Sequence, residues 1–216
     1  MLELGVKVLL AYCLGSIVGA LVIGAIRGVD IRTMGSGNAG GTNALRTQGL
    51  AFATATVVID VGKGWLAAGW LPGLALPGIP ADPTIGRDWL AVCCAVASVA
   101  GHVWPLWHDF RGGKGGATLA GVLLALAPVL LVIAVATWLG FALLFGYVGL
   151  ATVAAAASVP VAAAAFAWES LPLLTFGIAT MLLVAWAHRG NFARIRAGKE
   201  PRAEKLWLLR PRKRPS

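Results

Sequence analysis

Three short segments of this chain combine glycine with side chains that bind anions. The first, over residues 35–46, holds four glycines among hydroxyl and amide side chains and ends in an arginine. Glycine lets successive backbone N–H groups converge on one anion, and the arginine fork matches two oxygens of a phosphate. A plain turn between helices is the alternative, because Gly, Ser and Asn are also common turn residues. The phosphate ligands predicted here are Ser36, Asn38, Thr42, Asn43 and Arg46.

The second segment surrounds one lysine with glycine. Lys114 has two glycines on either side and lies just before a long apolar stretch. A helix N-terminus offers unpaired N–H groups and the positive end of the helix dipole, so a phosphate there gains these donors and the ammonium. A lysine that merely marks a membrane surface is the alternative, but four glycines would then cost conformational entropy without benefit. The expected phosphate-binding residues are Gly112, Gly113, Lys114 and Gly115.

The third segment, residues 188–200, follows the last apolar stretch. If the chain stays helical there, a spacing of three residues places His188, Asn191 and Arg194 on one face. Such a face would form a polar wall at the level of the lipid headgroups. Basic residues after a last membrane span are also ordinary anchors, so the functional interpretation depends on His188 and Asn191.

The composition places these segments in a membrane protein. Of the 216 residues, 58% are hydrophobic and 12% are charged, and the mean hydropathy is +0.80. These values exclude an ordinary soluble domain. The net charge is +9, but ten of the eighteen Lys and Arg lie between Arg189 and Arg214, which indicates a basic tail and no nucleic-acid surface. The first glycine loop lacks the spacing of a Walker A or Rossmann motif, and we expect neither a cofactor nor a metal.

Apolar stretches long enough to cross a bilayer recur along the chain. About 20 helical residues cross the hydrocarbon core. We expect one helix over residues 8–26 and further spans over 50–71, 88–107 and 171–187. The stretch 115–168 contains no charged residue and no histidine, and it suits either two comfortable helices or three short ones.

Basic residues decide between two and three helices, because cytoplasmic loops collect Lys and Arg. The loops 27–49 and 108–116 and the tail from His188 onward have a positive balance, whereas the loop 72–88 has a negative one. The three positive segments are therefore expected inside and the negative loop outside. All three glycine-rich or polar segments then lie on the cytoplasmic face.

The chain must cross the membrane an even number of times between two inside segments. The stretch 115–168 must then hold three helices, with breaks near 128–132 and 146–149. This predicts an all-α polytopic membrane protein of seven transmembrane helices, with the N-terminus outside and the C-terminus inside. Residues 1–200 would form the membrane domain and 201–216 a basic cytoplasmic tail. A re-entrant segment would overturn the count.

Two charged residues lie inside the second expected span. Asp60 and Lys63 are three residues apart, so they share a helix face. They either neutralise each other in lipid or belong to the site. Both interpretations remain open.

The three segments together resemble a known enzyme family. GSGNAGGTNALR, GHVWPLWHDFRGGKGGAT and HRGNFARIRAGKE are similar to the signature segments of the bacterial acyl-phosphate-dependent glycerol-3-phosphate acyltransferases. Their order and spacing match over about residues 1–200, as does a DIR segment after the first span. The resemblance implies a seven-helix enzyme of the bacterial inner membrane, with its active site facing the cytoplasm. It would transfer the acyl chain of a long-chain acyl phosphate to the 1-hydroxyl of glycerol 3-phosphate, giving lysophosphatidic acid and phosphate.

The resemblance also assigns roles to residues. It implies that Lys114, Arg46, His188 and Asn191 are catalytic and that the other residues named in the two glycine segments bind substrate phosphate. The chain departs from the family pattern at Gly41, Gly116 and Ala187. Ala187 stands where an arginine often precedes the histidine, so one cation that would help to hold a phosphate is missing.

Acyl phosphate is a mixed anhydride with a good leaving group, so orientation of the hydroxyl against the carbonyl can suffice without a covalent intermediate. The base is either His188 or a phosphate oxygen of the substrate. A transporter of a phosphorylated solute is the alternative function, although transporters bind near the bilayer midplane, and a lipid-binding scaffold without chemistry is a third. The expected partners are the two substrates and membrane lipids, with anionic lipid at the basic tail.

Overall fold

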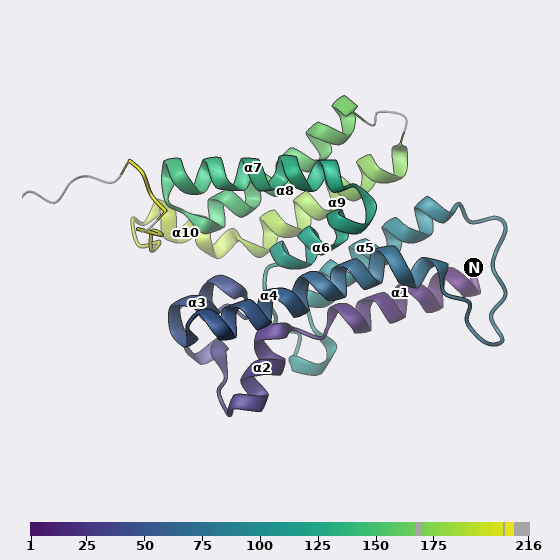
Figure 1. Ribbon diagram of the computed structural model, residues 1–216, viewed down its shortest axis with the longest axis horizontal. Helices are drawn as coiled ribbons and strands as arrows, with labels where there is room; N and C mark the ends of the chain where they lie inside the picture. Colours follow the sequence, from purple (N-terminus) through teal and green to yellow (C-terminus); the bar gives the residue numbers. More distant parts are fainter. Residues whose placement is uncertain (167–169, 205, 210–216) are drawn as a thin grey trace, which may run out of the picture.

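The computed structural model describes residues 1–166, 170–204 and 206–209. Within these ranges the chain is built from helices joined by loops, with one isolated bridge between Leu76 and Ile79 (Figure 1). The predicted all-α class is therefore confirmed. Four helices are long and apolar enough to cross a membrane, and two bent helix pairs raise the number of candidate spans to six.

The first span is broken, so the single helix expected over 8–26 is wrong. Helix α1 (Leu2–Gly15) and helix α2 (Gly19–Arg27) meet at an angle of 47°. The break is held open by charged residues of another helix. The carbonyl oxygen of Ile17 accepts from Lys63 Nζ at 2.8 Å, and the N–H of Gly19 donates to Asp60 Oδ1 at 3.0 Å.

The next two spans lie where the hydropathy predicts them. Helix α4 (Leu50–Trp65) continues through one π turn, η2 (Leu66–Trp70), and a 3-10 turn, η3 (Leu71–Gly73). Helix α5 (Arg87–Val103) follows after a loop and is extended by the short turn η4 (Leu106–His108). Both stretches qualify as membrane spans.

The described part of the uncharged stretch 115–168 contains three helices, of which the last two qualify as candidate membrane spans. They are α6 (Gly116–Leu126), α7 (Pro128–Phe145) and α8 (Val148–Phe166). Pro128 starts α7 because its missing N–H is harmless in a first turn. Gly146 ends α7 in the left-handed conformation, with φ +73°. Helix α6 has only 11 residues, which is about 16 Å of helix.

The last expected helix is confirmed, but its straight extension is not, and it qualifies as a candidate span only together with the helix that follows. Helix α9 (Leu171–Ala187) has the predicted bounds. The chain then bends by 51° at His188 into α10 (Arg189–Arg196), so His188 does not continue one straight face with Asn191 and Arg194.

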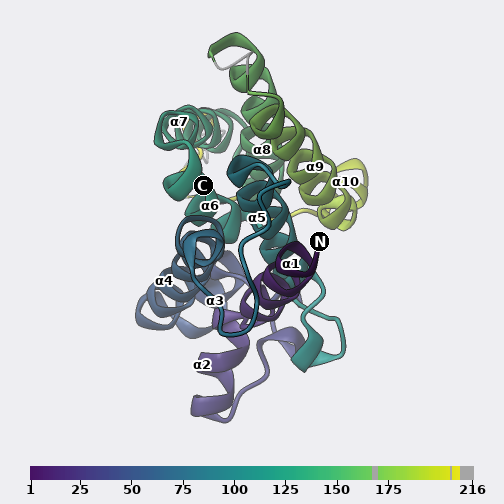
Figure 2. The same ribbon diagram turned by 90° about the vertical axis from the view of Figure 1, so that its right-hand side faces the viewer.

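The helices form two groups around a shared centre. Helices α7, α8 and α9 pack together on one side, α1 and α4 lie on the other, and α5 and α6 lie between them (Figure 2). Small residues allow the close approaches. A Cβ atom at Gly121 of α6 would lie 1.9 Å from the carbonyl oxygen of Val61 on α4, and one at Gly15 of α1 would lie 2.1 Å from that of Ser98 on α5.

The polar elements gather at one end of the molecule. The turn η1 (Ile31–Thr33), helix α3 (Gly41–Gln48) and α10 lie at that end, whereas the N-terminus and the loop after η3 lie at the other (Figure 1). The end with α3 and α10 carries the three segments in which chemistry is expected.

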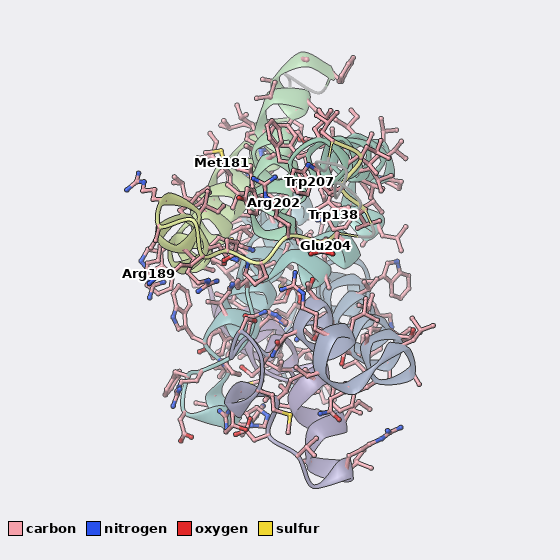
Figure 3. The ribbon with its side chains drawn as sticks, turned by 90° about the vertical axis from the view of Figure 1, so that its left-hand side faces the viewer. Trp138, Met181, Arg189, Arg202, Glu204 and Trp207 are labelled. Atoms are coloured by element: carbon pink, nitrogen blue, oxygen red, sulfur yellow. The ribbon has the colours of Figure 1, made fainter. Side chains whose placement is uncertain are left out.

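The described part of the tail, 201–204 and 206–209, folds back on the turn between α7 and α8. The N–H of Ala203 donates to the carbonyl oxygen of Gly146 at 2.8 Å. The guanidinium carbon of Arg202 lies 3.8 Å from the ring centre of Trp207 and 4.6 Å from that of Tyr147. Arg202 and Trp207 are labelled in Figure 3. The expected lipid contacts of the basic residues 210–216 lie outside the described residues.

Candidate active site

The first glycine segment is folded around one buried amide. Asn43 is 1% exposed, and its Oδ1 accepts from the N–H of Ser36 at 3.0 Å. Its Nδ2 donates to the carbonyl oxygens of Ile31 at 3.2 Å and Met34 at 3.0 Å. Three hydrogen bonds within the chain therefore occupy the side chain that the sequence assigns to phosphate. Asn43 shapes the loop that presents its neighbours.

The glycines of the second segment serve a close approach of three chain segments. The N–H groups of Gly112 and Gly113 donate to the carbonyl oxygens of Val103 at 3.2 Å and His102 at 3.0 Å. A Cβ atom at Gly113 would lie 2.1 Å from His102 Nε2 and 2.8 Å from the carbonyl oxygen of Ala39. The two amides therefore fasten the loop to the end of α5, whereas the sequence predicts that they face a phosphate.

Lys114 is joined to the third segment by a chain of polar contacts. Its Nζ donates to Asn191 Oδ1. Asn191 Nδ2 in turn donates to Glu200 Oε1 at 2.6 Å, and Arg194 Nε donates to Glu200 Oε2 at 2.6 Å. The structure thus brings together two residues, Lys114 and Asn191, that the sequence analysis places in separate segments of one site.

A polar cavity of about 270 Å³ lies beside this chain of contacts. Three of the described residues that line it are cationic and none of them is acidic. Residues of all three segments line it, whereas the sequence predicts only that the segments lie on the same face of the membrane. The lining residues are Ser36, Gly37, Asn38, Lys114, Ala187, Arg189, Gly190 and Arg194.

The cations of the cavity are held in different ways. Arg189, which is labelled in Figure 3, is exposed. It stacks on Trp186, with its guanidinium carbon 3.6 Å from the ring centre, and its Nη1 donates to the carbonyl oxygen of Trp186 at 3.0 Å. Arg194 is fixed by Glu200. Burial lowers the pKa of Lys114 to about 8, and the nearby charge of Arg194 acts in the same direction. Lys114 is thus a cation that loses its charge more easily than an exposed lysine.

Several predicted residues lie outside the cavity lining. Arg46 and Thr42 are exposed on α3 and are not among the described lining residues, whose cations besides Lys114 are Arg189 and Arg194. Gly115 caps the N-terminus of α6 with φ +83°. His188 is 4% exposed, and its Nδ1 lies 2.8 Å from the carbonyl oxygen of Val184.

Two contributions were missed by the sequence analysis. Glu200, whose side chain is 7% exposed, orients both Asn191 and Arg194. Its signal was a single acid within a run of basic residues. Arg189 was treated only as a tail cation, and the bend after α9 that directs it to the cavity has no signature in the residue spacing.

Asp60 and Lys63 form a buried ion pair of 2.9 Å. Lys63 Nζ also lies 2.9 Å from His102 Nδ1. None of the three residues belongs to the described lining of the cavity. The pair is thus a neighbour of the Lys114 loop, through His102, and not a direct part of the cavity.

Comparison with known proteins identifies the family. The family model described as glycerol-3-phosphate acyltransferase matches residues 6–198. A relative of that name from Burkholderia ambifaria is 39% identical over 196 residues, covering 90% of this chain and 88% of the relative. Another, from Synechococcus elongatus, is 40% identical over 195 residues, covering 90% and 91%.

Solved structures agree with this match. The glycerol 3-phosphate form of PlsY (YgiH), an integral membrane glycerol 3-phosphate acyltransferase, superposes with a TM-score of 0.79 at 32% identity, over 92% of this chain and 94% of PlsY. The lysophosphatidic acid form gives a TM-score of 0.79 at 31% identity, over 94% and 97%. The chain is thus an integral membrane protein that belongs to the glycerol-3-phosphate acyltransferase family.

Proposed function

We propose that this protein transfers the acyl chain of acyl phosphate to the 1-hydroxyl of sn-glycerol 3-phosphate, giving lysophosphatidic acid and inorganic phosphate. The observation that carries the proposal is the cavity in which Lys114, Arg189 and Arg194 converge with the polar loop at Ser36 and Asn38. Solved relatives are described with glycerol 3-phosphate and with lysophosphatidic acid, which are the acceptor and the product of this reaction.

The charge of the cavity suits the problem that the reaction poses. Both substrates carry a phosphate, and two anions brought together repel each other unless fixed positive charge surrounds them. Lys114 and the two arginines of α10 supply that charge on one side. Arg46 and Thr42, exposed on the neighbouring α3, are proposed to contact the second phosphate-bearing substrate.

The proposed chemistry is a direct acyl transfer. The oxygen of the glycerol 1-hydroxyl attacks the carbonyl carbon of acyl phosphate and forms the ester bond. The bond from that carbon to the phosphate oxygen breaks, and phosphate leaves with the bonding electrons. The hydroxyl proton passes to a phosphate oxygen of the substrate. Cations around the phosphate stabilise the charge that develops on the leaving group.

The surroundings of His188 favour the substrate phosphate as the base. A backbone carbonyl only accepts, so His188 Nδ1 donates to Val184 and Nε2 stays the basic nitrogen, but the ring is not among the described lining residues of the cavity. The ring is buried, while its two chain neighbours, Ala187 and Arg189, line the cavity. We propose that His188 fixes the bend between α9 and α10 and thereby aims Arg189. Asn191 has the corresponding role for Lys114.

The proposed topology has seven membrane spans, with the N-terminus outside and the cavity facing the cytoplasm of a bacterial inner membrane. It is supported by the placement of α3 and α10 at the end opposite the N-terminus (Figure 1). Helix α6, the fourth crossing along the chain, is added to the six candidate spans to give seven. It is short, but it packs against α4, α5 and α7. Residues 1–200 would then form the catalytic domain and 201–216 its cytoplasmic extension.

The donor assay tests this proposal. Purified protein is supplied with glycerol 3-phosphate and either palmitoyl phosphate or palmitoyl-CoA, and lysophosphatidic acid is measured. We expect lysophosphatidic acid when palmitoyl phosphate is the donor and none when palmitoyl-CoA is the donor. Product only with palmitoyl-CoA would contradict the donor assignment. Uptake of labelled glycerol 3-phosphate into proteoliposomes without any acyl donor, together with no product, would instead show a transporter.

A further inference from the structure

Three buried polar side chains lie directly behind the Lys114 loop and have no part in the proposed chemistry. Asp60 and Lys63 of α4 and His102 of α5 are each at most 3% exposed. Lys63 Nζ lies 2.9 Å from Asp60 Oδ1, and His102 Nδ1 lies 3.3 Å from the same oxygen. We call these residues the Asp60–Lys63–His102 triad.

Lys63 fixes the orientation of the histidine ring. Its ammonium has three donors, and they meet three acceptors: Asp60 Oδ1 at 2.9 Å, the carbonyl oxygen of Ile17 at 2.8 Å and His102 Nδ1 at 2.9 Å. An ammonium cannot accept, so His102 Nδ1 is the acceptor and the ring proton lies on Nε2. One edge of the His102 ring is therefore held by an ammonium group whose three N–H donors all have acceptors.

The opposite edge of the ring lies against the Lys114 loop. A Cβ atom at Gly113 would be only 2.1 Å from His102 Nε2. The carbonyl oxygen of His102 also accepts the N–H of Gly113 at 3.0 Å. Gly113 is thus held by both the ring and the backbone of one residue, and Lys114 is the next residue in the chain.

The triad also holds the start of the first glycine segment. The carbonyl oxygen of Ile17 and the N–H of Gly19, on either side of the break between α1 and α2, bind Lys63 and Asp60. Helix α2 leads directly into the loop that Asn43 folds. One buried cluster therefore contacts the elements that carry both phosphate-binding loops.

Stability alone does not account for such a cluster. Removing charges from water is costly, and replacing a buried ion pair by apolar residues of similar volume is often neutral or stabilising. From these contacts we propose that the Asp60–Lys63–His102 triad is a positioning unit that fixes the Lys114 loop relative to the first glycine segment. The positioning role rests on the proposed function, because its tests measure acyl transfer at the Lys114 cavity.

The first test replaces the ion pair by apolar residues, with Asp60→Leu and Lys63→Met combined. A misplacement of about 1 Å can cost about 100-fold in rate, so we expect the KM for glycerol 3-phosphate to rise at least about tenfold in the folded variant. The carbonyl oxygen of Ile17 and the N–H of Gly19 lose their partners in this variant, so its thermal midpoint should fall, and KM and kcat are read only at a temperature at which the variant is folded. Thr56→Val is the matched control, since Thr56 Oγ1 is buried on the same helix without a hydrogen-bond partner among the described residues. A folded double variant with the parent's KM and kcat would overturn the proposal.

The second test uses the contact between His102 and Gly113 and does not depend on the first variant folding. Gly113→Ala places a methyl group against His102 Nε2, at 2.1 Å, and the carbonyl oxygen of Ala39, at 2.8 Å, and His102→Ala removes the closer of these two obstacles. We expect each single change to lower kcat/KM at least about tenfold, and the combined change to lower it less than the product of the two factors. Losses that multiply would contradict the proposed contact.

The two proposals fail in different ways. If Lys114→Ala keeps full activity, the proposed function of the cavity is wrong. If Lys114 is required but the triad variants are folded and show the parent's kinetic constants, only the positioning role is wrong.

Discussion

The ammonium of Lys114, on the loop before α6, donates to the side-chain oxygen of Asn191 on α10, 77 positions later in the chain. This contact joins the second and third segments into one wall of the cavity. Asn191 is itself fixed from two sides. Glu200 accepts from its amide, and Gly149 of α8 lies directly beneath it. The position of the Lys114 ammonium thus depends on groups that never meet a substrate.

Gly149→Ala tests this dependence. The new Cβ atom would lie 2.6 Å from Asn191 Nδ2 and 2.8 Å from its Cγ, so Asn191 must move. We expect kcat/KM to fall at least about tenfold, as geometric misplacement of a binding group predicts. Gly140→Ala on α7 is the matched control, because nothing lies within 4 Å of its Cβ position. Equal activity of the two variants would show that Asn191 does not hold Lys114.

The pH dependence follows from the charge of Lys114. Its pKa is lowered to about 8, chiefly by burial and also by Arg194. A lysine is cationic below its pKa, so kcat/KM, which reports the free enzyme, should fall as the pH rises through about 8. Phosphate monoesters are already dianions there, with a second pKa of about 6. The fall in kcat/KM therefore reports the titration of a group of the enzyme and not of the substrate.

Arg194→Gln checks the assignment of that alkaline limb. Removing a neighbouring positive charge raises the pKa of Lys114, so the limb should move to higher pH even though substrate binding weakens. The measurement is kcat/KM between pH 6 and 10 for the parent and the variant. A limb that stays in place or moves to lower pH would mean that a different group titrates.

A substitution at Ala187 is expected to lower the KM. Ala187 lines the cavity, and the family resemblance drawn from the sequence implies an arginine at this position. Ala187→Arg adds a cation near the phosphate, and an exposed charge pair contributes about 0.5–1 kcal/mol, so KM should fall about two- to fivefold at low salt. Ala187→Gln has similar reach without the charge and serves as the control. An equal change in both variants would remove the electrostatic explanation.

His188→Asn separates the two candidates for the base. The Asn amide can keep the donor that His188 Nδ1 gives to Val184, while the basic nitrogen is lost. We expect the variant to retain activity within about tenfold, whereas loss of a general base costs about 100- to 10,000-fold. A loss in that larger range, in a folded variant, would assign the base to His188.

The sequence predicted helices well because hydropathy and charge act over long stretches. The bounds of α9 and the three helices of the uncharged stretch 115–168 were found in this way. The break in the first span was not, since its backbone groups are held by Asp60 and Lys63, which lie about forty residues away in the chain. The residues around the break do not by themselves indicate that contact.

The site was predicted in its parts but not in its geometry. Glycine density located the loops, yet Asn43, Gly112 and Gly113 use their polar groups to build those loops. Whether a residue binds substrate or shapes its loop depends on which polar group lies closest to it in the folded protein. Spacing along the chain does not determine it, and for the same reason Arg189 was overlooked.

The most direct measurement compares two lysine substitutions in the same acyl-transfer assay. Lys114→Ala removes one of the three cations of the described cavity lining, and Lys199→Ala removes an exposed lysine outside that lining. With palmitoyl phosphate and glycerol 3-phosphate as substrates, we predict that Lys199→Ala forms lysophosphatidic acid at the parent rate and that folded Lys114→Ala forms almost none. Full product formation by Lys114→Ala would contradict the account.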